Sequence, residues 1–439
     1  MPQFDQNEEK AFIIEKIKER PVNKKKLAQR TLLTAAMAVM FGLIACLTFL
    51  LLEPIISKVL YPQEQPQIVV FPEDQDEMAP EDMLSDSKDE QNEDSLLSDG
   101  EELPGELAEN IFSMDSYQQM YASMSEYVEE LRRCMVSVTG LHSDVDWFNE
   151  VQTSKYQTYG VIIANNSVEL LVLTKYEPLE EADRISLTFF NEEQRTAQLK
   201  SYDKVSGLAI VGVNLEDMKA DGSDLMEQIS IARLGVSSTK SFVGSPVVAL
   251  GTSSGLGDSV HYGMITAQHT QQTLADRAYS FWITNITGND SSDGMLFNLR
   301  GQLIGIITNN ISGSDYENMI TVYGISELKK TIEKLSNQEP IAYLGVHTKN
   351  VSKEAHEEMD VPYGAFIKRV EMSSPAMVEG MQIGDIITSI DGDKIDDYSD
   401  YSSKLLRLAP NQTVEIIIMR QSQSGYKEIK FNITLTEVP

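Results

Sequence analysis

Apolar and polar residues follow three different patterns along the chain, and each pattern predicts a different kind of element. From Thr31 to Leu52 no residue is charged, and as a helix these 22 residues would span about 33 Å, enough to cross the hydrocarbon core of a bilayer. From 114 to 133 apolar residues recur every three or four positions, which is typical of an amphipathic helix that packs on the domain after it. Beyond Cys134 apolar residues gather in short runs between glycines and polar turns, which predicts strands.

The strand runs divide into two units. The first, residues 134–338, contains many short runs and one helix from Ser326 to Leu335, a pattern typical of an all-β sandwich or a pair of barrels. The second, residues 339–439, mixes strands with two short helices, one opened by Ser374-Pro375 and one from Tyr398 to Leu406. The chain is therefore predicted to be mainly β, with an α+β unit at its C-terminal end.

Acidic residues are concentrated between residues 54 and 113. Seventeen acidic residues and a single lysine, Lys88, lie between Pro62 and Glu109. This segment contains several prolines and no apolar periodicity, so it cannot bury enough apolar surface to offset its chain entropy. We predict an acidic disordered linker over 54–113, with an acidic interaction tail as the alternative. A nucleic-acid partner is not expected, because phosphate binding needs a basic face.

The residues before the apolar stretch are basic. Positions 1–30 hold eight Lys/Arg against five Asp/Glu. The positive-inside rule then predicts a cytoplasmic basic tail over 1–30, a single transmembrane helix over 31–53 and an extracytoplasmic C-terminal bulk. A cleavable signal peptide is the alternative, but the apolar run is long, and Glu53-Pro54 follows it in place of the small residues typical of a cleavage site.

The chain has two cysteines. Cys46 lies inside the predicted span and Cys134 beyond it, so the two cannot pair within one chain and no intramolecular disulfide is expected. Neither cysteine has a neighbour at metal-ligand spacing. We therefore expect no metal site and no cofactor.

The segment around Ser292 carries the most chemical information. It reads Asp290-Ser291-Ser292-Asp293-Gly294-Met295-Leu296, and a polar turn at Arg300-Gly301 and an apolar strand follow it. A trypsin-like protease carries Gly-x-Ser-Gly-Gly-Pro in this place, so the serine is present but its neighbours differ.

About the last 300 residues of the chain resemble the HtrA (DegP-like) family of membrane-anchored or exported serine proteases. The resemblance implies a trypsin-like double β-barrel over 134–338 and a PDZ domain over 339–439. The residues that carry it are Leu208-Ala209-Ile210-Val211, Val248-Ala249-Leu250-Gly251-Thr252, the stretch from Asn298 to Ile306, Tyr343-Leu344-Gly345-Val346, Ser373-Ser374-Pro375-Ala376, Gly380-Met381, Gly384-Asp385-Ile386-Ile387 and Ile390-Asp391-Gly392.

The resemblance places Ser292 at the position of the catalytic nucleophile. The family's histidine follows Leu-Thr and two polar residues, and here Leu173-Thr174-Lys175-Tyr176 is followed by Glu177. The family's aspartate precedes the Leu-Ala strand, and here that position is Gly207. Two glycines of the serine loop are replaced by Asp290 and Asp293, and the proline is replaced by Met295.

These replacements remove most of the catalytic chemistry. A serine hydroxyl is a poor nucleophile without a base, and a carboxylate such as Glu177 is a weak base at neutral pH. Asp290 adds negative charge where an oxyanion would form. A serine–lysine dyad with Lys175 is conceivable, although its spacing does not favour it. The five histidines are predicted to be structural or solvent-facing, and they are His142, His261, His269, His347 and His356.

The PDZ part keeps its motif. The resemblance implies that the backbone N–H groups of Tyr343, Leu344, Gly345 and Val346 hold the C-terminal carboxylate of a peptide, which adds as a strand facing the 398–406 helix. A PDZ fold used only for packing or assembly is the alternative. Family members are often trimers, which implies homo-oligomerisation.

Two functions follow from these residues. The favoured one is a membrane-anchored pseudoprotease that binds extracytoplasmic peptides or misfolded proteins and acts as a scaffold or regulator in envelope protein quality control. The alternative is a serine-type endopeptidase of low or unconventional activity that uses Ser292. A purely structural envelope protein is a third and weaker interpretation.

Overall fold

The computed structural model describes residues 32–44, 48, 66–72, 114–145, 151–219, 222–237, 243–252, 257–308, 318–423 and 425–438. The chain divides into two compact units, Met1–Glu64 and Gln65–Pro439. In the first unit residues 32–44 form a helix. Among the residues that the structure describes, no helix is both long enough and apolar enough to cross a membrane. The predicted cytoplasmic tail, most of the remaining predicted span and residues 54–65 and 73–113 of the linker lie outside the described residues.

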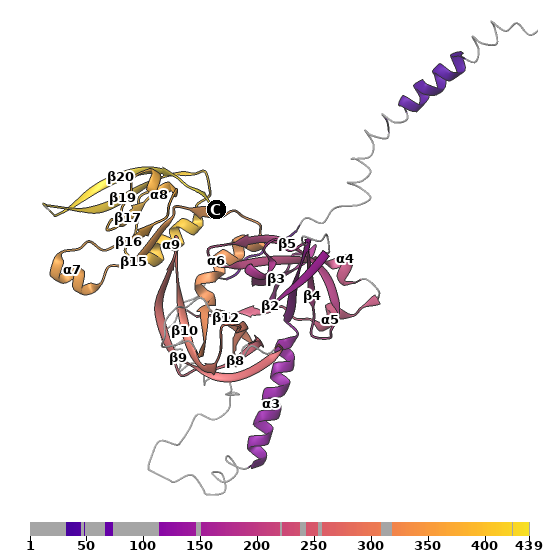
Figure 1. The fold of residues 1–439 in the computed structure, drawn as a ribbon, viewed down its shortest axis with the longest axis horizontal. Coiled ribbons are helices and arrows are strands. Elements are labelled where there is room, and N and C mark those ends of the chain that lie inside the picture. Colours follow the sequence, from indigo (N-terminus) through magenta and orange to yellow (C-terminus); the bar gives the residue numbers. More distant parts are fainter. Residues whose placement is uncertain are drawn as a thin grey trace, which may run out of the picture. The chain divides into compact units, whose positions relative to one another are not determined.

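The first strands of the second unit form a closed barrel in the order β1-β2-β3-β6-β5-β4 (Figure 1). Its alternating apolar side chains fill one core, in which Val138, Ile162 and Leu187 are fully buried. Short helices lie between the strands. The barrel consists of β1 (Met135–Val145), β2 (Val151–Asn165), β3 (Glu169–Lys175), the 3-10 helix η2 (Glu177–Leu179), β4 (Arg184–Thr188), β5 (Gln194–Asp203) and β6 (Leu208–Asn214), followed by α4 (Leu215–Met218) and α5 (Leu225–Gln228).

The next strands form a second sheet in the order β11-β8-β9-β10-β13-β12-β7, and pairing of β11 with β12 closes the ring. The expected pair of barrels is therefore present, and the predicted helix at Ser326–Leu335 is α6. The elements are β7 (Arg233–Leu234), β8 (Pro246–Thr252), β9 (Ser259–Leu274), β10 (Arg277–Thr287), β11 (Asp293–Asn298), β12 (Gln302–Thr308), β13 (Met319–Gly324) and α6 (Ile325–Ser336).

The helix predicted over 114–133 is α3 (Met114–Arg132), and only its C-terminal part packs on the barrels. Val128 and Leu131 are buried in the core that the two barrels share. The hydroxyl of Tyr127 donates to the carbonyl of Asn298 and accepts from the N–H of Gly301 at 2.7 Å, which fastens the helix to the β11–β12 turn. The apolar side chains at its N-terminal end are exposed, and they are Met114, Tyr117, Met120 and Tyr121.

At residues 66–72 the structure contradicts the predicted disorder of the acidic linker. Asn337 accepts a hydrogen bond from the N–H of Val69 at 2.8 Å and donates one to its carbonyl at 2.7 Å. The side chains of Val69 and Phe71 pack against the shared core. The prediction is wrong for these residues because the acidic composition of the whole segment masks a local apolar run, Ile68-Val69-Val70-Phe71.

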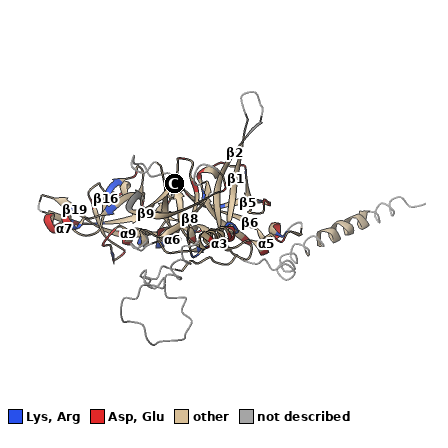
Figure 2. Cartoon of the chain, turned by 90° about the horizontal axis from the view of Figure 1, so that it is seen from below, with Lys and Arg blue, Asp and Glu red and all other residues tan. Residues whose placement is uncertain are grey.

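The C-terminal residues form the α+β unit. Its main sheet has the order β15-β16-β17-β19-β20, which leaves β15 at an edge. Acidic residues lie on α7 and basic residues on β16 (Figure 2). The buried carboxylate of Asp385 forms an ion pair with the partly exposed Arg420 at 2.6 Å. The elements are β14 (Ala342–Tyr343), β15 (Val346–Asn350), α7 (Lys353–Met359), β16 (Ala365–Val370), α8 (Pro375–Val378), β17 (Ile386–Ile390), β18 (Asp393–Lys394), α9 (Tyr398–Arg407), β19 (Thr413–Ser422), β20 (Gly425–Thr434) and β21 (Thr436–Glu437).

Both helices predicted in this unit are present as α8 and α9. Ser374 caps α8, with its hydroxyl accepting from the N–H of Met377 at 3.2 Å, and Pro375 takes the first helical position. Asp397 caps α9 by accepting from the N–H of Asp400 at 2.9 Å. Helix α7 was not predicted, because it has too few apolar residues to show a helical period, and none of its residues is buried.

Candidate functional site

The two positions predicted to correspond to the family's histidine and aspartate, Glu177 and Gly207, lie close together in the first barrel. Glu177 is the exposed first residue of η2, directly after β3. The N–H of Tyr176 donates to the carbonyl of Gly207 at 2.8 Å, which brings the two positions together. Gly207 has a φ of 70°, and a side chain added there would meet no atom within 4 Å. No neighbouring atom blocks a side chain at this position, but its left-handed φ would strain one.

Ser292 lies in a closed turn just before β11. Its N–H donates to the carbonyl of Asn289 at 2.9 Å, and its hydroxyl accepts from the N–H of Asn289 at 2.8 Å. The side chain is buried, with only 2% of the residue exposed. An oxyanion hole needs free N–H donors, and a nucleophile must reach its substrate. In this conformation the turn uses both groups of Ser292 for itself.

Asp293 connects the serine loop to the first barrel. Its carboxylate forms an ion pair with Lys175 at 2.7 Å. It also accepts from the hydroxyl of Thr158 at 2.6 Å and from the N–H of Tyr159 at 2.9 Å. Lys175 ends β3 two residues before Glu177, so this ion pair links the two barrels close to Glu177.

Lys175 does not take the place of the missing base. The ammonium of Lys175 is bound by the Asp293 carboxylate, whereas a general base must accept a proton. Of the histidines, His142 lies beside η2, where its Nε2 is 3.3 Å from the carbonyl oxygen of Pro178. His261 lies on β9, in the second barrel.

We expect Asp293→Ala to destabilise the joined barrels by about 2–3 kcal/mol, because it leaves the N–H of Tyr159 and the ammonium of Lys175 without their acceptor. The measurement is the midpoint of thermal unfolding of the full chain. Ser291→Ala is the matched control, since that side chain is exposed two residues away, and it should leave the midpoint unchanged. Equal midpoints for both variants would show that the ion pair contributes nothing.

The four residues predicted to bind a peptide carboxylate come together as a loop, and the loop is already filled. The N–H of Leu344 donates to a carboxylate oxygen of Asp276 at 2.7 Å, and the N–H of Val346 donates to the other oxygen at 2.9 Å. The N–H of Gly345 lies 3.0 and 2.8 Å from the two oxygens. Tyr343 is buried beside the loop.

Two further groups complete the surroundings of Asp276. The hydroxyl of Tyr401, on α9, donates to the carboxylate at 2.7 Å. Burial raises the pKa of Asp276, and the backbone donors of the loop oppose that rise. Burial, together with the negative charge of Asp276, also raises the pKa of Tyr401 well above its usual value.

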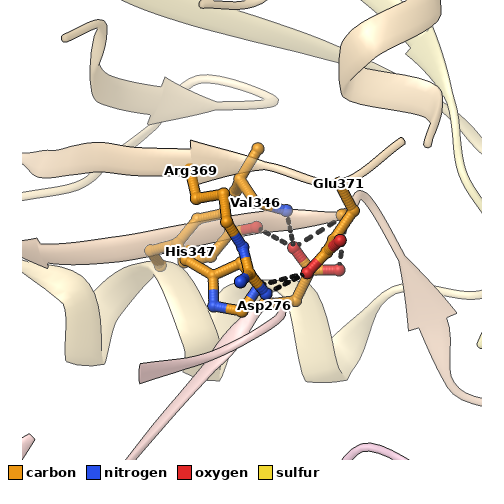
Figure 3. A network of polar contacts seen from close by, with 7 residues as sticks. Asp276, Val346, His347, Arg369 and Glu371 are labelled. Atoms are coloured by element: carbon orange, nitrogen blue, oxygen red, sulfur yellow. Dashed lines mark hydrogen bonds and ion pairs between the residues drawn. The ribbon is translucent and has the colours of Figure 1, made fainter. Parts of the chain in front are cut away.

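A second polar group lies beside the loop (Figure 3). Glu371 binds His347 at 2.5 Å and also pairs with Arg369, and its own N–H donates to the carbonyl of Gly345 at 2.8 Å. The hydrogen bond from His347, with a further contribution from Arg369, holds the pKa of Glu371 below its usual value. These three side chains support the carboxylate loop from the side of the main sheet of this domain.

Sequence reasoning did not identify Asp276 or Thr158 as parts of these sites. Asp276 is a lone aspartate in the turn Leu274-Ala275-Asp276-Arg277, which is an ordinary turn signal. Its partner, the loop at 344–346, lies about 70 residues further along the chain, so only the fold reveals the contact. Within the described residues, no group of three or more histidine, cysteine or acidic side chains is arranged to hold a metal ion.

Residues 158–306 match the trypsin-like peptidase domain family, and residues 342–435 match the PDZ domain family. A probable periplasmic serine endoprotease DegP-like of Halomonas elongata is 27% identical over 276 residues, covering 60% of this chain and 53% of that protein. The serine protease Do-like HtrB of Bacillus subtilis is 22% identical over 351 residues, covering 72% and 71% of the two chains.

Among solved structures, that of the HtrA-type protease AlgW with a decapeptide covers 72% of this chain and 98% of its own, with a TM-score of 0.52 and 20% identity, a likeness of fold. The chain spans about half the length of the first curated relatives that it matches. The chain is an HtrA-like protein, in which a trypsin-like peptidase domain is followed by a PDZ domain.

Proposed function

We propose that this chain is a pseudoprotease of the HtrA type that binds extracytoplasmic peptides or misfolded proteins through its PDZ domain. It would then act as a scaffold or regulator in envelope protein quality control. The observation that carries the first part is the state of Ser292, which is buried and hydrogen-bonded within its own turn. Glu177 and Gly207 at the two partner positions, and the Lys175–Asp293 ion pair, agree with it.

We also propose that the protein is anchored in the cell membrane by one helix over 31–53, with both folded domains extracytoplasmic. The support is the uncharged stretch of 22 residues after a basic segment. Several of the relatives are described as periplasmic proteins, which agrees with extracytoplasmic domains. Self-association, as in the trimers of the family, is part of the same proposal.

The second candidate function is a serine endopeptidase of unconventional activity. One observation favours it, namely that the serine itself is retained at the nucleophile position. Activity would require the Asn289–Ser292 turn to open and free both the hydroxyl and the N–H of Ser292. It would also require a base other than Glu177.

We expect the full chain to show neither labelling of Ser292 by a fluorophosphonate probe nor casein hydrolysis above that of Ser292→Ala. The reason is that removal of triad members lowers turnover by on the order of a millionfold in a well-studied protease. A relative with an intact triad serves as the positive control. Labelling that disappears in Ser292→Ala would contradict the pseudoprotease proposal and support the endopeptidase.

A further inference from the structure

The carboxylate loop of the PDZ domain holds a carboxylate that belongs to the peptidase-like domain. A C-terminal carboxylate is recognised by consecutive backbone N–H groups that surround both of its oxygens. The N–H groups of Leu344, Gly345 and Val346 make this arrangement around Asp276, at 2.7 to 3.0 Å. The same donors cannot hold a second carboxylate at the same time.

Asp276 reaches the loop because it lies at the tip of the β9–β10 hairpin (Figure 1). Leu274 pairs with Arg277, so Ala275 and Asp276 form a two-residue turn. Asp276 has a φ of 63°, a left-handed conformation that aspartate adopts more readily than most residues. The turn thereby presents the carboxylate outward from the second barrel.

The hairpin also occupies the place of the peptide strand. It contacts β15, the edge strand, and α9, the helix that faces it. The N–H of Asp276 donates to the carbonyl of Val346 at 2.7 Å, which is a main-chain bond of the kind an added strand makes. Both the carboxylate and the backbone of the hairpin tip therefore stand in for the end of a bound peptide.

We propose that Asp276 is an internal ligand that keeps the PDZ carboxylate loop closed, and that a partner with a free C-terminal carboxylate binds by displacing it. This inference rests on the proposed peptide-binding function. Because Asp276 is attached to the same chain, it competes at a high effective concentration. The apparent affinity for a peptide is lowered by the fraction of molecules in which the loop is open, so a loop open in about 1% of molecules weakens binding about 100-fold.

The test uses the full chain in lipid nanodiscs and two variants of the hairpin tip. Asp276→Gly removes the carboxylate and accepts the left-handed φ without strain, while Asp276→Asn keeps the shape and removes the charge. Asp360→Gly is the matched control, because Asp360 also has a positive φ of 56° and lies exposed in the PDZ domain. The probe is a fluorescent decapeptide mixture with randomised positions and a free C-terminal carboxylate, compared with the same mixture as C-terminal amides.

We expect Asp276→Gly to bind the carboxylate mixture at least about tenfold more tightly than the unchanged chain, with a smaller gain for Asp276→Asn. The amide mixture and Asp360→Gly should show no gain. Equal affinity of Asp276→Gly and the unchanged chain for the carboxylate mixture would overturn the proposal. A gain that is the same for amides would also overturn it, because the loop would then not select a carboxylate.

Amide hydrogen exchange at residues 344–346 separates this proposal from the peptide-binding function. We expect these amides to exchange at least about tenfold faster in Asp276→Gly, because they lose their acceptor. Faster exchange without binding of any peptide would support Asp276 as the ligand of the loop and would contradict the proposed peptide-binding function. Unchanged exchange would overturn the internal ligand, whatever the peptides do.

Discussion

Arg277→Ala is expected to destabilise the joined barrels by about 3–5 kcal/mol, the largest loss expected from any single ion pair among the described residues. Arg277, on β10, pairs with Asp203, on β5, and both side chains are almost completely buried, with 2% and 0% exposed. Removal of the guanidinium leaves the Asp203 carboxylate charged and buried without its cation. For a domain of this size the thermal midpoint should fall by on the order of 10 °C.

Asp203 transmits this loss to the turn that precedes Gly207. Its carboxylate accepts from the N–H of Ser206 at 3.0 Å, and its carbonyl accepts from the N–H of Gly207 at 2.9 Å. Asp203 therefore holds two places at once. It holds the turn that ends at Gly207, and through Arg277 it anchors the hairpin tip beside Asp276. In Arg277→Ala, amide hydrogen exchange should accelerate both in the turn before Gly207 and at the hairpin tip.

Two controls distinguish a buried ion pair from general damage. Lys204 follows Asp203 in the chain and forms an exposed ion pair with Glu180. Lys204→Ala removes this pair and should change the thermal midpoint little. The double variant Arg277→Met with Asp203→Leu removes both charges and should recover most of the lost stability. A double variant as unstable as Arg277→Ala would mean that packing, and not the unpaired charge, determines the loss.

The fold followed from the sequence where short-range pattern determines it. Strand runs such as Leu208-Ala209-Ile210-Val211 predicted buried strands, and the polar turn at Arg300-Gly301 correctly predicted the β11–β12 hairpin. The expected helix ends at α6 and α9 agreed with the structure to within one residue. These features depend on side-chain periodicity and turn chemistry, both of which are local.

The contacts that define the two sites did not follow from the sequence. Arg277 and Asp203 are separated by 74 residues, and Asp276 and Gly345 by 69. Each is an ordinary charged or turn residue in its local context, so no spacing rule links them. The docking of Phe71 beside Glu333 was missed for the same reason, since the composition of its segment outweighed four apolar residues.

The serine loop itself shows which residues the fold needs. Of the two glycines that follow the serine in the family, the first has become Asp293 and the second remains as Gly294. A Cβ added to Gly294 would lie 2.0 Å from the carbonyl oxygen of Leu250, and the φ of 133° belongs to glycine. Across the β8–β11 pair its partner is Gly251, which is equally confined, with 2.5 Å to the carbonyl oxygen of Asp293.

Gly294→Ala is therefore expected to abolish the folded chain, because relief of the clash requires β8 and β11 to separate in the second barrel. The measurement is the yield of purified protein in lipid nanodiscs, with circular dichroism of any purified material. Gly207→Ala is the control at a positive φ of 70° without a neighbour within 4 Å, and it should cost only about 1 kcal/mol. A folded Gly294→Ala chain with an unchanged melting temperature would contradict the argument. The contrast between the two glycines separates two kinds of position: the backbone requires a glycine at Gly294, whereas a side chain at Gly207 would meet no neighbouring atom.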